Sequence, residues 1–129
     1  MSDKRAEKVI AEIDKQIEER GYTAVPDVLI GIGMLSEEKF SEWKKGDLRC
    51  LEDVCSADLS KLHSVLKSIK AYAEETGLKP SIVRYSTDGR NQIPLRFTMS
   101  GNPVLERLYS TQYLDPWRAQ EIRRGRKGR

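Results

Sequence analysis

Residues 81–100 read SIVRYSTDGRNQIPLRFTMS, which is two alternating runs on either side of Asp88-Gly89. Successive side chains of a strand point to opposite faces, so the second run predicts one apolar face made by Ile93, Leu95, Phe97 and Met99. In the first run, Val83 and Tyr85 fall on the same side. Asp-Gly between two such runs favours a tight turn, because glycine adopts positive φ freely. The stretch therefore predicts a β-hairpin with one buried face.

The opposite face and the turn of this hairpin carry three arginines, Arg84, Arg90 and Arg96. One interpretation is a nucleic-acid wing, in which each arginine contacts a phosphate and steepens the salt dependence of binding. The other is a sheet face that is kept charged to prevent pairing with other strands. Pro94 indicates an edge strand, because proline cannot donate to a strand ladder. Both interpretations of the arginines remain open.

Helical patterns lie on both sides of the hairpin. They predict helices over residues 3–20, from Pro26, over 36–46, over 58–76 and from Pro103, with a short connection at 22–25. The longest has an apolar stripe of Leu59, Leu62, Leu66, Ile69 and Ala73. The first presents Ala6, Ile10, Ile13 and Ile17, and the last extends its core face to Tyr113. We expect an α+β, mostly helical single domain of four to five helices with one β-hairpin, compatible with a winged-helix-like arrangement.

Charge is unevenly distributed along the chain. Residues 118–129 contain six basic residues and one acid, a net charge of +5, whereas the rest of the chain sums to −2. The final RRGRKGR lacks apolar residues, which predicts a flexible basic tail at 118–129 after a globular domain at 1–117. Such tails bind nucleic acid or solubilise a chain end. The basic residues of the tail that we expect at a nucleic acid are Arg123, Arg124, Arg126, Lys127 and Arg129. Trp117, just before the tail, is expected to dock on the body rather than to stack on a base.

The composition is that of a polar globular protein, with 129 residues of which 38% are hydrophobic and 33% charged. No run approaches the length of a membrane span, and the N-terminal MSDKRAEKVI lacks the apolar core of a secretion signal. The two cysteines, Cys50 and Cys55, do not make a disulfide framework. We therefore expect a cytoplasmic protein without a membrane partner.

The segment VPDVLIGIGMLSEEKFSEWKKGD, residues 25–47, resembles a helix-turn-helix of the phage-repressor type. In that family a short apolar helix meets a glycine-containing turn, and the second helix often ends in Trp-x-x-Gly, here Trp43 and Gly46. The resemblance implies a DNA-binding helix pair at 26–46, with Lys44 and Lys45 at the nucleic acid. The exposed side of the second helix starts with Glu37 and Glu38, and acids there would repel phosphates. Plain helical packing is the alternative.

A broader resemblance covers much of residues 25–114. It is carried by PDVLIGIGML, the Trp43/Gly46 pair, LSKL at 59–62, GLKPS at 77–81, LRF at 95–97, SG at 100–101 and the Glu106/Tyr109 pair. These residues look like those of a small uncharacterised bacterial protein family with no established activity. The resemblance implies a bacterial setting and no mechanism.

Patterns that indicate catalysis or a metal site are weak. His63 is the only histidine and lies beside the apolar stripe of the long helix, so we interpret it as a packing residue at the edge of the core. Cys50, Cys55 and His63 lack the four-ligand spacing of structural zinc. GIG at 31–33 lacks the remaining residues of a phosphate-binding loop. We expect no catalytic residue, no metal and no cofactor.

Two functions from different classes are consistent with these observations. The first is a small bacterial nucleic-acid-binding protein, with DNA favoured, that has no enzymatic activity and uses the basic hairpin and the basic tail. The second is a protein-interaction module of the accessory or immunity type, whose acidic body binds a partner protein. Only the first requires binding that weakens steeply as salt rises.

Overall fold

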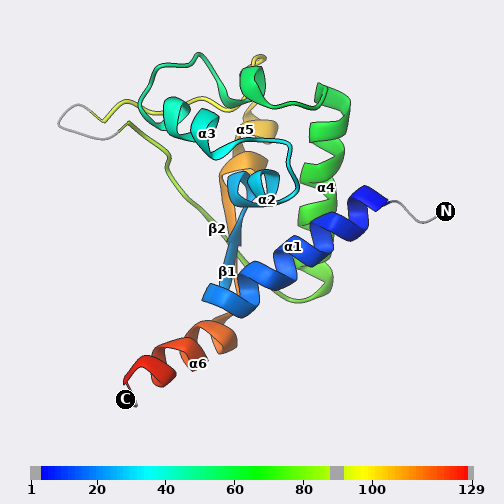
Figure 1. The fold of residues 1–129 in the computed structure, drawn as a ribbon, viewed down its shortest axis with the longest axis vertical. Helices are drawn as coiled ribbons and strands as arrows, with labels where there is room; N and C mark the ends of the chain where they lie inside the picture. Colours follow the sequence, from blue (N-terminus) through cyan, green and yellow to red (C-terminus); the bar gives the residue numbers. More distant parts are fainter. Residues whose placement is uncertain (1–3, 88–91, 128–129) are drawn as a thin grey trace.

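The computed structural model describes residues 4–87 and 92–127, and only the backbone of residues 126 and 127. Within these residues the chain forms six α-helices, one 3-10 helix and three short strands (Figure 1). Their order is α1 (Lys4–Arg20), β1 (Tyr22–Ala24), α2 (Val25–Gly31), α3 (Glu37–Lys44), η1 (Leu51–Val54), α4 (Leu59–Glu75), β2 (Lys79–Ile82), α5 (Pro103–Ser110), β3 (Thr111–Leu114) and α6 (Pro116–Lys127). The α+β, mostly helical fold class is confirmed.

The core is centred on α4, which packs against α1 and α5. Four residues of the predicted stripe are buried, Leu62, Leu66, Ile69 and Ala73. Leu59 is the exception at 42% exposed, because it occupies the first residue of the helix. On α1 the buried side is set by Val9 and Ile13, so the expected contribution of Ile10 to the core is wrong.

Local signals place α3 and its ends where the sequence predicts them. The Ser36 hydroxyl accepts a hydrogen bond from the Lys39 N–H at 3.1 Å, which satisfies one of the free donors at the start of α3. After the helix, Gly46 has a φ of +86°, a conformation that favours glycine. The helix pair at 26–46 thus exists as α2 and α3, and DNA reading by this pair stays a prediction.

The sheet differs from the predicted hairpin. Its strand order is β1-β3-β2, and both pairs are antiparallel. The strand β2 therefore pairs with β3 and not with the second run of the predicted hairpin. The sequence predicted residues 22–25, which contain β1, as a connection, and residues 111–113, which belong to β3, as helix. Strands of three and four residues carry little periodicity, and β3 forms because Thr111 and Tyr113 bury one side of it.

The 81–100 segment keeps only a short antiparallel pairing. One isolated bridge joins Ser86 to Pro94, flanked by hydrogen bonds of 2.9 Å from Thr87 N to Ile93 O and from Leu95 N to Tyr85 O. The predicted Asp88-Gly89 turn lies outside the described residues. Along the second run, Leu95 is half-buried and Phe97 buried as predicted. Ile93 at 61% and Met99 at 49% are exposed, whereas Thr98 is buried.

Candidate nucleic-acid interface

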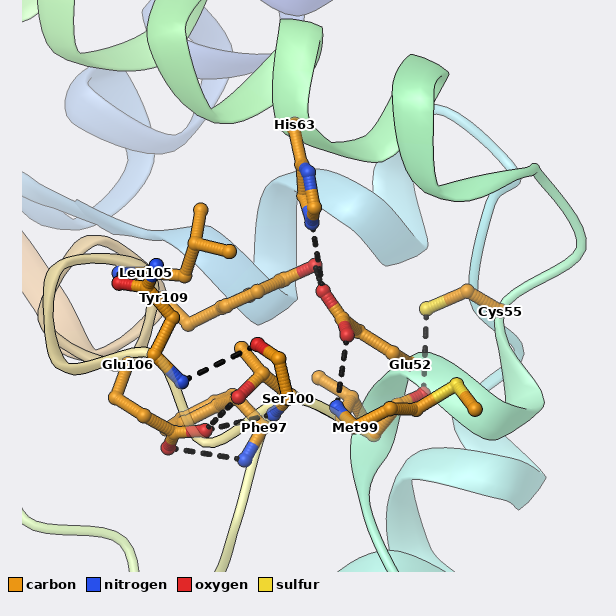
Figure 2. Close-up of polar contacts among 12 residues, drawn as sticks. Glu52, Cys55, His63, Phe97, Met99, Ser100, Leu105, Glu106 and Tyr109 are labelled. Atoms are coloured by element: carbon orange, nitrogen blue, oxygen red, sulfur yellow. Dashed lines mark hydrogen bonds and ion pairs between the residues drawn. The ribbon is translucent and has the colours of Figure 1, made fainter.

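Two carboxylates hold the backbone of residues 97–99 in place of a strand ladder (Figure 2). Glu106 on α5 accepts hydrogen bonds from Phe97 N at 3.1 Å and from Thr98 N at 2.8 Å. The Thr98 hydroxyl also donates to Glu106, at 2.5 Å. Glu52 in η1 accepts from Met99 N at 3.0 Å. These bonds draw Thr98 inward, and this explains why the predicted strand alternation fails there.

Glu52 is buried and contacts three neighbouring groups. Its side chain is 2% exposed, and one carboxylate oxygen accepts from the Tyr109 hydroxyl at 2.8 Å. The same oxygen lies 2.9 Å from His63 Nε2. Burial and the bond to Glu52 raise the pKa of Tyr109 well above its ordinary value. Both carboxylate oxygens of Glu52 thus accept a hydrogen bond, one from Met99 N and the other from the Tyr109 hydroxyl. The cluster braces η1 against α4 and α5 (Figure 2).

Two of the predicted phosphate contacts on the hairpin side bind the chain itself. The Arg96 guanidinium donates from Nε to Thr98 O at 2.8 Å and from Nη2 to Met99 O at 2.9 Å. Lys44 Nζ donates to Ser86 O at 3.2 Å and lies 5.7 Å from the centre of the Tyr85 ring. Lys45 is exposed at the end of α3. Arg90 lies outside the described residues.

Arg84 lies in a groove that also contains an arginine absent from the sequence predictions, Arg107 of α5. Both side chains are exposed, and no described residue pairs with either guanidinium. The groove has a volume of about 720 Å³ and is also lined by Ile82, Tyr85, Leu95 and Phe97. We call it the Arg84 groove. No local pattern could have revealed Arg107, because residues 84 and 107 are brought together only by the tertiary fold.

The segment expected as a flexible tail is helical through Lys127. Asp115 caps α6 by accepting from Arg118 N at 3.1 Å. Arg118 then binds α1, with Nε donating to Glu18 O at 2.9 Å and Nη2 lying 3.1 Å from Glu18 Oε1. In Figure 1, α6 lies at the opposite end of the molecule from α3 and α5. The division into a domain and a separate tail stays a prediction.

Trp117 does not dock on the body, so that expectation is wrong. It is 79% exposed, whereas the second tryptophan, Trp43, is fully buried. Arg124 follows Trp117 by seven residues, which is about two helical turns, so the two share one side of α6. Arg123 and Arg124 are exposed, have no described partner and line a hollow of about 380 Å³ with Pro116 and Gln120. We call this surface, with Trp117, the α6 face.

The side chains of the remaining basic residues of the predicted tail lie outside the described part of the structure. The backbone of Arg126 and Lys127 belongs to α6, and their side chains lie outside the described part of the structure. Arg129 lies outside it altogether.

A close approach between Gly21 and Ala119 also anchors α6. Gly21 has a φ of +82°, and a Cβ there would lie 2.7 Å from Ala119 Cα. We expect Gly21→Ala to lower the free energy of unfolding by about 2 kcal/mol and to loosen α6, because alanine disfavours this φ and collides with Ala119. Limited trypsin digestion should cut faster after Arg118, Arg123 or Arg124, and a thermal melt gives the stability.

Gly77→Ala is the matched control. Gly77 has a φ of +73° but open space around its Cα. This variant should lose about 1 kcal/mol, from backbone conformation alone, and keep the wild-type trypsin pattern at α6. Equal acceleration of cleavage in both variants would contradict the anchoring role of Gly21.

Comparison of the chain with protein-family models, with curated proteins and with solved structures finds no match. Within residues 4–87 and 92–127, no helix is long and apolar enough to cross a membrane. The same residues contain no cluster of three or more His, Cys, Asp or Glu side chains placed to hold a metal.

Proposed function

We propose that this protein binds nucleic acid through the α6 face, with unpaired strands favoured, and catalyses no reaction. The observation that supports this most is the exposed Trp117 on the same side of a helix as Arg124. Bases stack on exposed aromatic rings, and arginines on the same surface neutralise the phosphates that follow. A duplex hides the faces of its bases, so an exposed indole favours single strands.

The distribution of charge supports the same surface. Residues 118–129 have a net charge of +5 and the rest of the chain −2. On the hairpin side, Arg96 and Lys44 donate to the chain's own carbonyls. The positive charge that attracts a polyanion therefore lies mainly on α6 and the residues after it. The sequence prediction used both the basic hairpin and the basic tail, and this proposal keeps the tail as the main binding surface.

The test is a salt titration of affinity for a fluorescein-labelled oligothymidylate, measured by anisotropy. For the double variant Arg123→Gln/Arg124→Gln we expect the slope of log affinity against log salt to become shallower by about 1.4, since each phosphate contact on a single strand contributes about 0.7. The matched control is Lys61→Gln/Lys67→Gln, which removes the same charge from exposed positions on α4.

Three outcomes decide this prediction. A shallower slope in the α6 variant and an unchanged slope in the α4 variant support the α6 face. Equal changes in both variants would mean that only net charge matters, and the proposal would fail. It would also fail if the wild-type protein showed no affinity for single-stranded or duplex DNA or RNA at low salt.

A second candidate function is a protein-interaction module. It is favoured by the Arg84 groove, in which two exposed arginines lie beside the apolar side chains of Ile82, Leu95 and Phe97.

A further inference from the structure

The Arg84 groove continues into a second hollow. This neighbour has a volume of about 330 Å³ and is lined by β2 residues Pro80, Ser81 and Ile82, by β3 and by the ends of α4 and α5. Ile82 and Arg107 line both hollows, so the two adjoin along one strand direction from Pro80 to Ser86. A surface of this form fits an extended chain better than a compact ligand.

The charges of this surface are unbalanced in favour of an acidic occupant. No described residue pairs with the guanidinium group of Arg84 or of Arg107. Of the acids that line the hollows, Glu106 is bound to the backbone of residues 97–98, and Glu74 pairs with Lys70 at 3.2 Å. Two cations are therefore left for an incoming carboxylate, which arginine binds with two parallel hydrogen bonds.

The apolar residues that line the groove and the free backbone groups of Arg84 favour a peptide over a nucleic acid as the occupant. Ile82 is 57% exposed beside half-buried Tyr85 and Leu95, which gives apolar surface for alternate side chains of a strand. No described residue hydrogen-bonds the N–H or C=O of Arg84. An added strand can satisfy such groups, whereas a phosphate backbone has no donor for the carbonyl.

We infer that the Arg84 groove docks an extended segment of a partner protein in which acidic and apolar residues alternate. The arginines would pair with the acids while the apolar residues lie on the floor. This binding site is separate from the α6 face, so it does not depend on the proposed nucleic-acid binding.

Fluorescence anisotropy with a labelled peptide that alternates glutamate and valine tests the inference on the full chain. The comparison peptide carries lysine in place of glutamate. We expect the glutamate peptide to bind, and Arg84→Glu/Arg107→Glu to weaken it about tenfold or more, because reversal turns attraction into repulsion. Arg123→Glu/Arg124→Glu, with the same change in net charge, should leave its affinity within about twofold.

Arg84→Gln/Arg107→Gln replaces the reversed variant if circular dichroism shows that the latter is unfolded. The inference is overturned if the lysine peptide binds as well as the glutamate peptide, or if the groove and α6 variants lose peptide affinity equally. It is also overturned if an oligothymidylate loses more affinity from the groove variant than from the α6 variant, because the groove would then be a nucleic-acid surface.

Discussion

Replacement of Glu52 with alanine is expected to lower the free energy of unfolding by about 3–5 kcal/mol. The side chain is 2% exposed and serves three neighbours: Met99 N, the Tyr109 hydroxyl and the His63 ring. Its loss leaves a part-buried backbone donor and a buried hydroxyl without this partner, and each unsatisfied group is costly. Chemical denaturation followed by circular dichroism measures the effect.

Two matched variants separate this contribution from the loss of charge in general. Glu52→Gln keeps one carbonyl acceptor and should lose about half as much. Glu37→Ala removes an exposed carboxylate from the first turn of α3 and should lose less than about 1 kcal/mol. If Glu52→Ala were no more destabilising than Glu37→Ala, the carboxylate would not brace the segment at residue 99.

Replacement of Trp117 with alanine is expected to weaken binding to oligothymidylate by about 30-fold, since a base stacked on an aromatic ring contributes about 2 kcal/mol. The stability should change little, because the side chain is 79% exposed. Anisotropy at fixed low salt gives the affinity, and a thermal melt checks the fold.

Trp117→Phe is the informative control for this prediction. Phenylalanine retains a ring face, so it should keep most of the affinity that alanine loses. A common loss in both variants would point to the indole N–H rather than to stacking. Unchanged affinity in Trp117→Ala would remove the main support for the α6 face.

Helices α1 to α4 and the start of α5 were predictable because their signals are local, whereas α6 was expected as a flexible tail. Ser36 caps α3 through a residue three positions away, and the stripe of α4 repeats within one helix. The pairs that make the sheet are of the opposite kind. Thr23 pairs with Tyr113, and such distant partners leave no trace in strands this short.

The hairpin was only partly predictable, and the reason lies in the chemistry of its hydrogen bonds. Alternation of apolar residues predicts a ladder of backbone bonds, but side-chain carboxylates take that role at residues 97–99. A sequence reading assigns Glu52 and Glu106 to solvent by default, because carboxylates are rarely buried unless paired. Their buried partners are set by the tertiary fold.

The candidate interface was predictable in charge and not in geometry. Arg123 and Arg124 were identified from the basic composition of the chain end, and they are exposed on α6. Trp117 was expected to pack, because aromatic residues usually bury their surface on folding. Instead α6 uses Ala119 against Gly21 and Arg118 against Glu18 for its contact with the body. The tryptophan is thereby left on the outer side.

The most direct test of nucleic-acid binding at α6 is the fluorescence of Trp117 during titration with an oligothymidylate at low salt. Trp43 is buried and Trp117 exposed, so their emission separates into short- and long-wavelength parts, and Trp117→Phe identifies the latter. Stacking on a base predicts saturable quenching of the long-wavelength emission, reversed by added salt. Binding that leaves this emission unchanged, or no binding at all, would contradict the proposed function.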